Sequence, residues 1–235
     1  MSITTGQATT LLENVLFESQ AVAQTNASYW VGLSQSVAAD ATIAGAATAM
    51  AATAEAGIAE QVVRYYEGAL GRIPAGSEVA YYVAFAETGL SQAQIAQGVS
   101  GVAQANWNQI SADFAASPEF TANYAGASPV SYLYLTILGR SPAASETAYY
   151  NAQLTAGAGV SQLLQEFVNS PEYTLKVNPT IAAALAQNGT AIANGQPGTL
   201  GRGVIINSSA ESAHSSADTA VVELVGTHHH IAALI

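Results

Sequence analysis

The sequence predicts a mainly α protein in which helix-loop-helix repeats pack as a bundle, with a short C-terminal β-prone tail. Three observations support this fold class. A segment recurs at a fixed offset, glycine, serine and proline mark helix ends at matching places in each copy, and 50% of the 235 residues are hydrophobic. A chain of this length and composition can bury a sizeable core. The sequence has no cysteine, so disulfides, thiolate catalysis and Cys-ligated zinc are excluded.

The repeat joins two stretches that lie 68 residues apart. Residues 63–74 end in Leu-Gly-Arg-Ile-Pro, and residues 131–142 end in Leu-Gly-Arg-Ser-Pro. The glutamate and the Ala-Tyr-Tyr triplet that follow the first motif, Glu78 and residues 80–82, recur at the same offset after the second motif. Identities that persist this far at one offset indicate an internal repeat.

A second landmark, Ser-Pro-Glu followed by an aromatic residue, ends each copy. It occupies residues 117–120 and 170–173, which are 53 residues apart, so the first copy is longer by 15 residues, which we place around 98–110. A weaker copy is predicted near the start, where residues 15–17 and 28–31 resemble the same landmarks with a two-residue slip. The predicted domains are N-terminal helices with a degenerate copy (1–60), repeat 1 (61–130), repeat 2 (131–180), and a linker with the C-terminal tail (181–235).

The helix ends follow from local backbone chemistry. Gly139 can take the left-handed conformation that closes a helix C-terminus. Ser141 is expected to cap the next helix, with Pro142 at its first position and Glu146 near its positive N-terminus. Ser-Pro-Glu repeats this start signal at a later helix. The tyrosine pair that ends at Tyr150 lies about two turns past the proline, where at least one ring should fold back onto the first helix.

Charge narrows the classes of partner. The chain has 16 Asp plus Glu against 5 Lys plus Arg, for a formal net charge of -11, so nucleic acid would be repelled. The sequence has neither a polybasic stretch to hold an anionic membrane nor an apolar run long enough for a transmembrane helix. Residues 1–7 lack the charged and apolar regions of a signal peptide, so any export is expected to be leaderless.

The combined motif resembles a known bacterial family. Leu-Gly-Arg-x-Pro, an aromatic pair starting seven residues after the proline, and Ser-Pro-Glu-(Phe/Tyr) are similar to the helical repeat called domain of unknown function 4214, over residues 61–176. The resemblance implies a secreted bacterial cell-surface protein of the S-layer or RTX type, exported by type I secretion. It also implies a homo-oligomer that self-assembles or anchors to lipopolysaccharide or extracellular polysaccharide. Calcium is implied by family association only, because the sequence lacks the RTX repeat Gly-Gly-x-Gly-x-Asp, and no other cofactor is expected.

The tail has two open interpretations. Residues 204–206 and 221–225 are short β-prone runs that could form a hairpin or donate a strand to a neighbouring subunit. The apolar end of the chain also suits an uncleaved C-terminal export signal. The residues before that end are His228, His229 and His230. Three consecutive residues cannot all face one ion from a regular strand, so no metal site is predicted there.

Arg72 and Arg140 are the most distinctive polar candidates for a binding site. Each arginine occupies the turn position of its copy. Its planar guanidinium can donate two hydrogen bonds at once to a carboxylate, a phosphate or a pair of sugar hydroxyls. A structural role is the favoured alternative, in which each Arg pairs with Glu78 or Glu146 across the turn, or bonds the carbonyls at the helix end.

Aromatic side chains supply the second set of candidates. A tyrosine offers an apolar face and a hydroxyl, so it can stack on a sugar ring. Helical spacing assigns most rings to the core. The remaining ligand-binding candidates are Tyr82, Tyr150, Trp30 and Trp107.

No catalytic residue is predicted. The sequence contains no Gly-x-Ser-x-Gly, P-loop, dinucleotide loop or His-Glu-x-x-His. Glu119 and Glu172 are explained by helix starts rather than by glycosidase chemistry. The leading hypothesis, which the repeat and the family resemblance imply, is a non-catalytic surface protein. An assembly scaffold or linker inside the cell, and a secreted hydrolase with an unrecognised site, are the alternatives.

Overall fold

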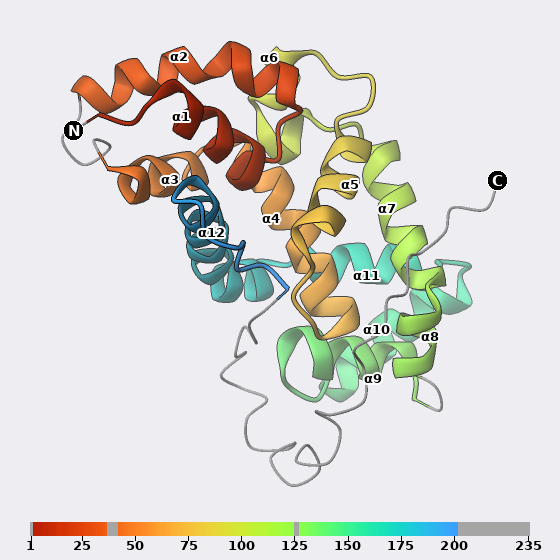
Figure 1. The fold of residues 1–235 in the computed structure, drawn as a ribbon. Helices are drawn as coiled ribbons and strands as arrows, with labels where there is room; N and C mark the ends of the chain where they lie inside the picture. Colours follow the sequence, from red (N-terminus) through yellow and green to blue (C-terminus); the bar gives the residue numbers. More distant parts are fainter. Residues whose placement is uncertain (1, 37–41, 125–126, 202–235) are drawn as a thin grey trace, which may run out of the picture. The chain divides into compact units, whose positions relative to one another are not determined.

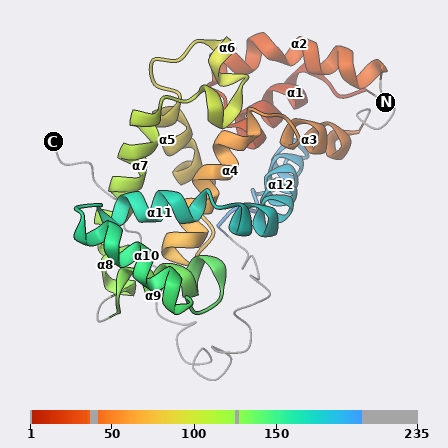
Figure 2. The ribbon, with the colours of Figure 1, turned by 180° about the vertical axis from the view of Figure 1, so that it is seen from behind.

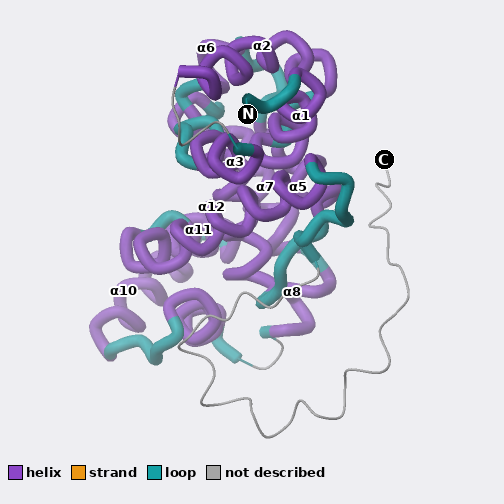
Figure 3. Tube along the Cα trace, turned by 60° about the vertical axis from the view of Figure 1, so that its left-hand side comes forward, coloured by secondary structure: helices purple, strands orange, loops and turns teal. Residues whose placement is uncertain are grey.

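The computed structural model describes residues 2–36, 42–124 and 127–201, and these residues form packed helices with no strand (Figures 1 and 3). The mainly α prediction is therefore confirmed for the described residues. The predicted β-prone tail and its three histidines lie outside these ranges. In the ranges described, no helix is both long enough and apolar enough to cross a membrane.

The helices follow one another in three similar groups. The first group contains α1 (Thr5–Leu11), η1 (Leu12–Leu16), α2 (Gln20–Ser36) and α3 (Ile43–Ala51). The second contains α4 (Ala56–Tyr65), η3 (Tyr66–Leu70), α5 (Gly76–Ala86), α6 (Gln92–Ile95), η4 (Gly98–Gly101), α7 (Gln104–Ala116) and α8 (Pro118–Asn123). The third contains α9 (Pro129–Leu133), η5 (Tyr134–Leu138), α10 (Ala144–Thr155), α11 (Val160–Val168) and α12 (Pro171–Ala193).

A shared turn ends the first helix of each group. The α-helix widens into a π-helical turn and stops at a left-handed residue, which is Phe17 (φ 62°), Gly71 (φ 69°) or Gly139 (φ 71°). The backbone N–H of the next residue, at positions 18, 72 and 140, then donates to the carbonyl six positions earlier, at 3.2, 3.4 and 3.3 Å. The left-handed helix end predicted at Gly139 is confirmed. The left-handed conformation costs Phe17 about 1–2 kcal/mol, because it has a side chain that glycine lacks. Burial of the Phe17 ring offsets this conformational cost.

A second shared feature is the capped start of a later helix. Ser117 and Ser170 accept the backbone N–H three residues ahead, at 3.1 and 3.3 Å, and proline follows each as the first helical residue. The predicted Ser-Pro start is confirmed at both places. Thr53 makes the matching bond at the start of α4, where its Oγ1 accepts the N–H of Ala56 at 3.3 Å.

The start of α10 differs from the expectation. The helix begins at Ala144, so Ser141 is not its cap and Pro142 is not its first residue. Glu146 caps it instead, because this carboxylate accepts the N–H of Ala143 at 2.7 Å. The two extra extended residues bring the glutamate over both this N–H and the arginine of the turn, which fixes where the helix begins.

The insertion in the second group begins earlier than expected. It comprises α6 and η4, within residues 87–103, and overlaps the predicted residues 98–110 only at 98–103. Residues 104–110 already belong to α7, where Trp107 and Ile110 are buried. The indole N–H of Trp107 donates to the carbonyl of Val99 at 3.4 Å and so ties the insertion to α7.

The long helix α12 continues through Pro179 to Ala193, so residues 181–193 are helical although we expected the linker to begin at 181. Proline inside a helix costs about 3 kcal/mol. Burial of Ile181 and Leu185 offsets that cost, since α12 packs against α3, α1 and η1 (Figure 1). Seen from behind, α7 and α11 also lie side by side (Figure 2).

Candidate functional site

Arg72 forms an ionic bridge across its turn. Nη1 and Nη2 donate to the two oxygens of Glu78 at 2.9 and 2.8 Å. Nε and Nη2 donate to Glu119, the second residue of α8, at 2.8 and 3.3 Å. The guanidinium carbon also lies 4.8 Å from the centroid of the Tyr66 ring. One side chain therefore joins the turn to the starts of α5 and α8.

Arg140 repeats this bridge in the third group. It donates to the two oxygens of Glu146 at 2.9 and 2.8 Å and to those of Glu172 at 2.7 and 3.0 Å. Its guanidinium carbon lies 4.8 Å from the centroid of the Tyr134 ring. The pairing with Glu78 and Glu146 that the sequence predicted is confirmed.

The second carboxylate of each bridge was missed from the sequence. Glu119 and Glu172 were interpreted only as helix-start residues, and the structure adds a bond from each to its arginine. The signal was present, since every copy with the Gly-Arg turn also carries Ser-Pro-Glu. In both bridges at least four guanidinium N–H groups are engaged within the protein. Ligand binding by Arg72 or Arg140 stays a prediction.

The bridges lower the pKa of Glu78, Glu146 and Glu172. Hydrogen bonds from Arg140, and then from the backbone N–H of Ala143, lower the pKa of Glu146 to about 2. Arg140 likewise lowers the pKa of Glu172. Burial acts to raise the pKa of Glu78, but the bonds from Arg72 and from a backbone N–H outweigh it, so that pKa is lowered as well. The Arg140 bridge therefore persists from mildly acidic pH upward.

Tyr82 and Tyr150 belong to two equivalent aromatic clusters. Tyr82 lies 6.1 Å from Tyr66 and 5.1 Å from Phe114 between ring centroids. Tyr150 makes the same contacts in the third group, 6.0 Å from Tyr134 and 5.0 Å from Phe167. The expectation that one ring of each pair folds back onto the first helix is confirmed. Both rings are partly buried by this packing.

The two tryptophans lie in the core. Trp30 is 8% exposed and Trp107 is 3% exposed. Each would have to leave its packing before it could stack on a sugar. Neither side chain offers an open face in this structure, so their binding role has no support from the geometry.

Three tyrosines that the predicted site residues did not include are exposed instead. Tyr29, Tyr81 and Tyr149 are 67%, 59% and 61% exposed, and we call them the outward tyrosines. Each directly precedes the inward ring of its helix and packs edge-on against it, with centroids 5.8, 5.0 and 5.1 Å apart. They therefore occupy one equivalent position in α2, α5 and α10, held by the neighbouring ring and open to solvent.

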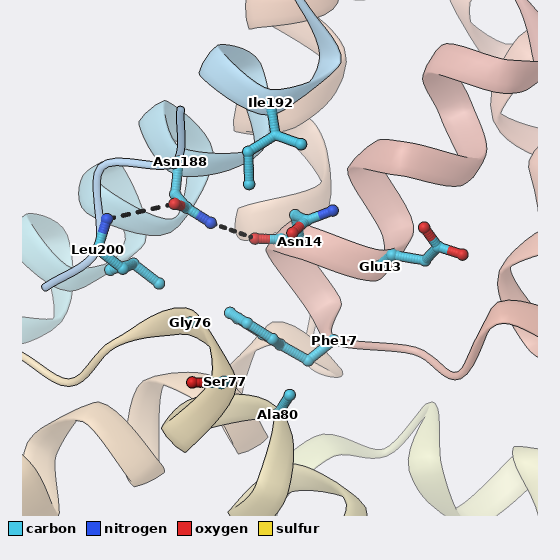
Figure 4. Close-up of a pocket in the computed structure, with 10 residues that line it drawn as sticks. Glu13, Asn14, Phe17, Gly76, Ser77, Ala80, Asn188, Ile192 and Leu200 are labelled. Carbon is cyan, nitrogen blue, oxygen red and sulfur yellow. Dashed lines mark hydrogen bonds between the residues drawn. The ribbon is translucent and has the colours of Figure 1, made fainter. Parts of the chain in front are cut away.

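A pocket of about 440 Å³ lies among η1, the start of α5 and the end of α12 (Figure 4). The buried Asn188 lines one side of the pocket and holds two chain segments together there through hydrogen bonds. Its Nδ2 donates to the carbonyl of Asn14 at 3.1 Å, and its Oδ1 accepts the N–H of Leu200 at 3.2 Å. Phe17 and Ala80 contribute an apolar side, and Glu13 is the acidic residue in the lining. Glu13, Asn14 and Ser77 also line the pocket, so its other polar side chains come from η1 and the start of α5.

Metal-binding geometry is not found in the part of the chain that the structure describes. Within it, no three His, Cys, Asp or Glu side chains are grouped to hold an ion. The family association with calcium stays a prediction.

Comparison with known proteins places one family segment in the chain. Residues 111–177 match the domain of unknown function DUF4214, so the chain contains this domain. The match runs from α7 into α12 and includes the whole Arg140 bridge. The resemblance predicted from the motifs is confirmed for this segment, whereas the turn at Arg72 lies outside it. No curated protein and no solved structure matches the chain.

Proposed function

We propose that this protein is a non-catalytic, secreted bacterial cell-surface protein that binds an extracellular or envelope polysaccharide through its repeated helices. The observation that carries the proposal is the recurrence of an outward tyrosine at the equivalent position of all three helix groups. A contact repeated along a protein suits a polymer of repeating units, because weak contacts made together give a higher overall affinity than any one of them.

Tyrosine is suited to this task. Its ring offers a rigid apolar face and its hydroxyl can exchange hydrogen bonds with sugar hydroxyls, while only two side-chain torsions are lost on binding. Each outward ring is already held edge-on by its inward neighbour, so the contact is partly preorganised.

Charge favours an uncharged polymer. A net charge of -11 opposes binding to phosphate-rich regions of an envelope polymer and permits binding to neutral sugar units. Self-assembly of the S-layer type is the second part of the proposal. Two exposed apolar side chains of the third group, Leu135 at 55% and Leu175 at 80%, support contact between copies.

A pull-down with neutral and with acidic insoluble polysaccharides tests the binding. The triple variant Tyr29→Ala, Tyr81→Ala, Tyr149→Ala should lose retention on the neutral polymer, while Gln20→Ala, an exposed polar control, should keep it. The conservative triple change of the same tyrosines to Phe should retain most binding because the stacking face remains. Equal retention of the Ala triple variant and the wild type would contradict the proposal.

Three further measurements separate the alternatives and test self-assembly. Cell fractionation that finds the protein only in the cytosol would refute secretion and favour an intracellular scaffold. Release of soluble sugar from the bound polymer would favour a hydrolase. A monomer at all concentrations in light scattering would refute self-assembly.

A further inference from the structure

The first helix group holds a different cluster where the other two groups hold the arginine bridge. Glu18 occupies the arginine's place, since it follows the left-handed residue and its N–H makes the same backbone bond to a carbonyl six positions earlier. Glu55 stands two residues after the capping Thr53, as Glu119 stands two residues after Ser117. The bridge of one cation with two carboxylates is thus replaced by a pair of carboxyl groups.

The third member of the cluster is an amide. Asn26 lies four residues before Trp30, as Glu78 lies four residues before Tyr82. Its Nδ2 donates to Glu18 Oε1 at 2.9 Å. All three positions of the arginine bridge are therefore filled in the first group, by Asn26, Glu18 and Glu55.

Glu18 is buried, Glu55 is partly buried, and the pair is short of hydrogen-bond donors. Glu18 is 7% exposed, and Glu18 Oε2 and Glu55 Oε1 are buried without a hydrogen-bond donor. The two carboxyl groups lie within hydrogen-bonding reach of each other. Two ionised carboxylates are both acceptors, so the pair can form this bond only when one of them carries a proton.

The insertion of the second group lies against the segment that carries Glu55. A Cβ on Gly98 would lie 1.9 Å from the carbonyl oxygen of Ala54, and one on Gly57 would lie 3.5 Å from Val99 Cγ2. Glu87, which begins the insertion, adds a third carboxyl whose pKa responds to both Glu18 and Glu55. The inserted residues 87–103 are thereby packed on the segment that carries Glu55.

The positively charged side chains of the described residues interact with groups other than Glu18 and Glu55. Arg72 and Arg140 are held in their bridges. Arg64 donates to Asn178 at 2.8 Å and acts on the pKa values of Glu60 and Glu67, and Lys176 acts on that of Glu172. Among the described residues, the amide of Asn26 is the other group that acts on the pair, and the pair in turn acts on the carboxyl of Glu87, so a proton can neutralise the pair.

We propose that the Glu18–Glu55 pair is a pH-sensitive latch, which holds residues 87–103 against the segment around Glu55 while the pair shares a proton and releases them as both carboxyls ionise.

The direction of the titration agrees with the geometry. Burial, and then the charge of Glu18, raises the pKa of Glu55 to about 7, and burial raises that of Glu18. Burial, and then the charges of Glu55 and Glu18, raises the pKa of Glu87 to about 7. A carboxyl whose folded-state pKa is raised stabilises the fold fully below its unfolded value of 4.5, and this stabilisation is lost as pH rises toward 7. The latch is closed at pH 5 and open at pH 7.5.

Hydrogen exchange followed by mass spectrometry tests the latch, with rates corrected for the intrinsic effect of pH. In the wild type, amides of residues 87–103 should exchange at least tenfold more slowly at pH 5 than at pH 7.5. Glu55→Gln fixes a donor at one member of the pair and should abolish most of this difference. Glu119→Gln, the change at the equivalent place in the second group, should leave it intact. An unchanged pH difference in Glu55→Gln would overturn the proposal.

Two more variants keep the test decisive if Glu55→Gln folds poorly. Glu87→Gln removes the partly exposed third carboxyl and should reduce the pH difference without abolishing it. The double change Glu18→Arg with Asn26→Glu restores the residues of the arginine bridge and should leave residues 87–103 equally protected at pH 5 and 7.5. A wild-type pH difference in both of these variants would also overturn the latch.

Discussion

Replacing Arg72 by alanine should destabilise the protein by about 2–3 kcal/mol. The side chains of Arg72, Glu78 and Glu119 are 36%, 30% and 40% exposed, so solvent weakens each ion pair. The two-point geometry places each pair near the upper end of the range for such sites, about 1 kcal/mol apiece. Loss of the contact with the Tyr66 ring adds about 0.5–1 kcal/mol. For a chain of this size the melting temperature should fall by about 5–10 °C.

Thermal unfolding at pH 7, followed by circular dichroism, measures this change. Arg72→Lys keeps the charge but cannot form the planar two-point contacts, so it should recover part of the loss and no more. In a double-mutant cycle, Arg72→Ala and Glu119→Gln should be non-additive by about 1 kcal/mol. A fall of less than about 2 °C for Arg72→Ala, or full additivity in the cycle, would refute the structural role of the bridge.

Two further substitutions test the packing and the caps. Gly189→Ala should destabilise the protein by about 1–2 kcal/mol, because the new Cβ would lie 2.3 Å from Cγ2 of the buried Val15. Adding Val15→Ala to the same chain should relieve this clash. A single variant that is more stable than the wild type would contradict the packing of α12 on η1. Ser170→Ala should cost about 1 kcal/mol in denaturant unfolding through loss of the cap of α12, whereas Ser161→Ala, whose residue caps no helix, should cost less.

Much of the fold could be predicted because its signals are local. The left-handed glycines and the Ser-Pro starts act within a few residues, and the repeat offset showed that they recur. Local signals were insufficient at the start of α10, where the decisive contact is the carboxylate of Glu146 with both Arg140 and a backbone N–H. They were also insufficient at Pro179, where packing of α12 outweighs the helix-breaking residue.

The candidate site was less predictable because it depends on which side of a helix faces the core. In α5 the buried residues Val79, Val83 and Ala86 form a helical stripe that includes Tyr82 and leaves Tyr81 outside. The spacing of these apolar residues is visible in the sequence and could have predicted that Tyr81, rather than Tyr82, faces solvent. The partnership of Arg72 with Glu119, 47 residues away, was not, since it depends on how the helices pack.

The central claim is that the outward tyrosines bind a neutral polysaccharide together. The most direct measurement is the equilibrium affinity for one neutral polysaccharide after one, two and three of Tyr29, Tyr81 and Tyr149 are changed to alanine. Each step should remove about 1 kcal/mol, or about fivefold in affinity, whichever tyrosine is changed first. An affinity that does not change across the series would contradict the claim.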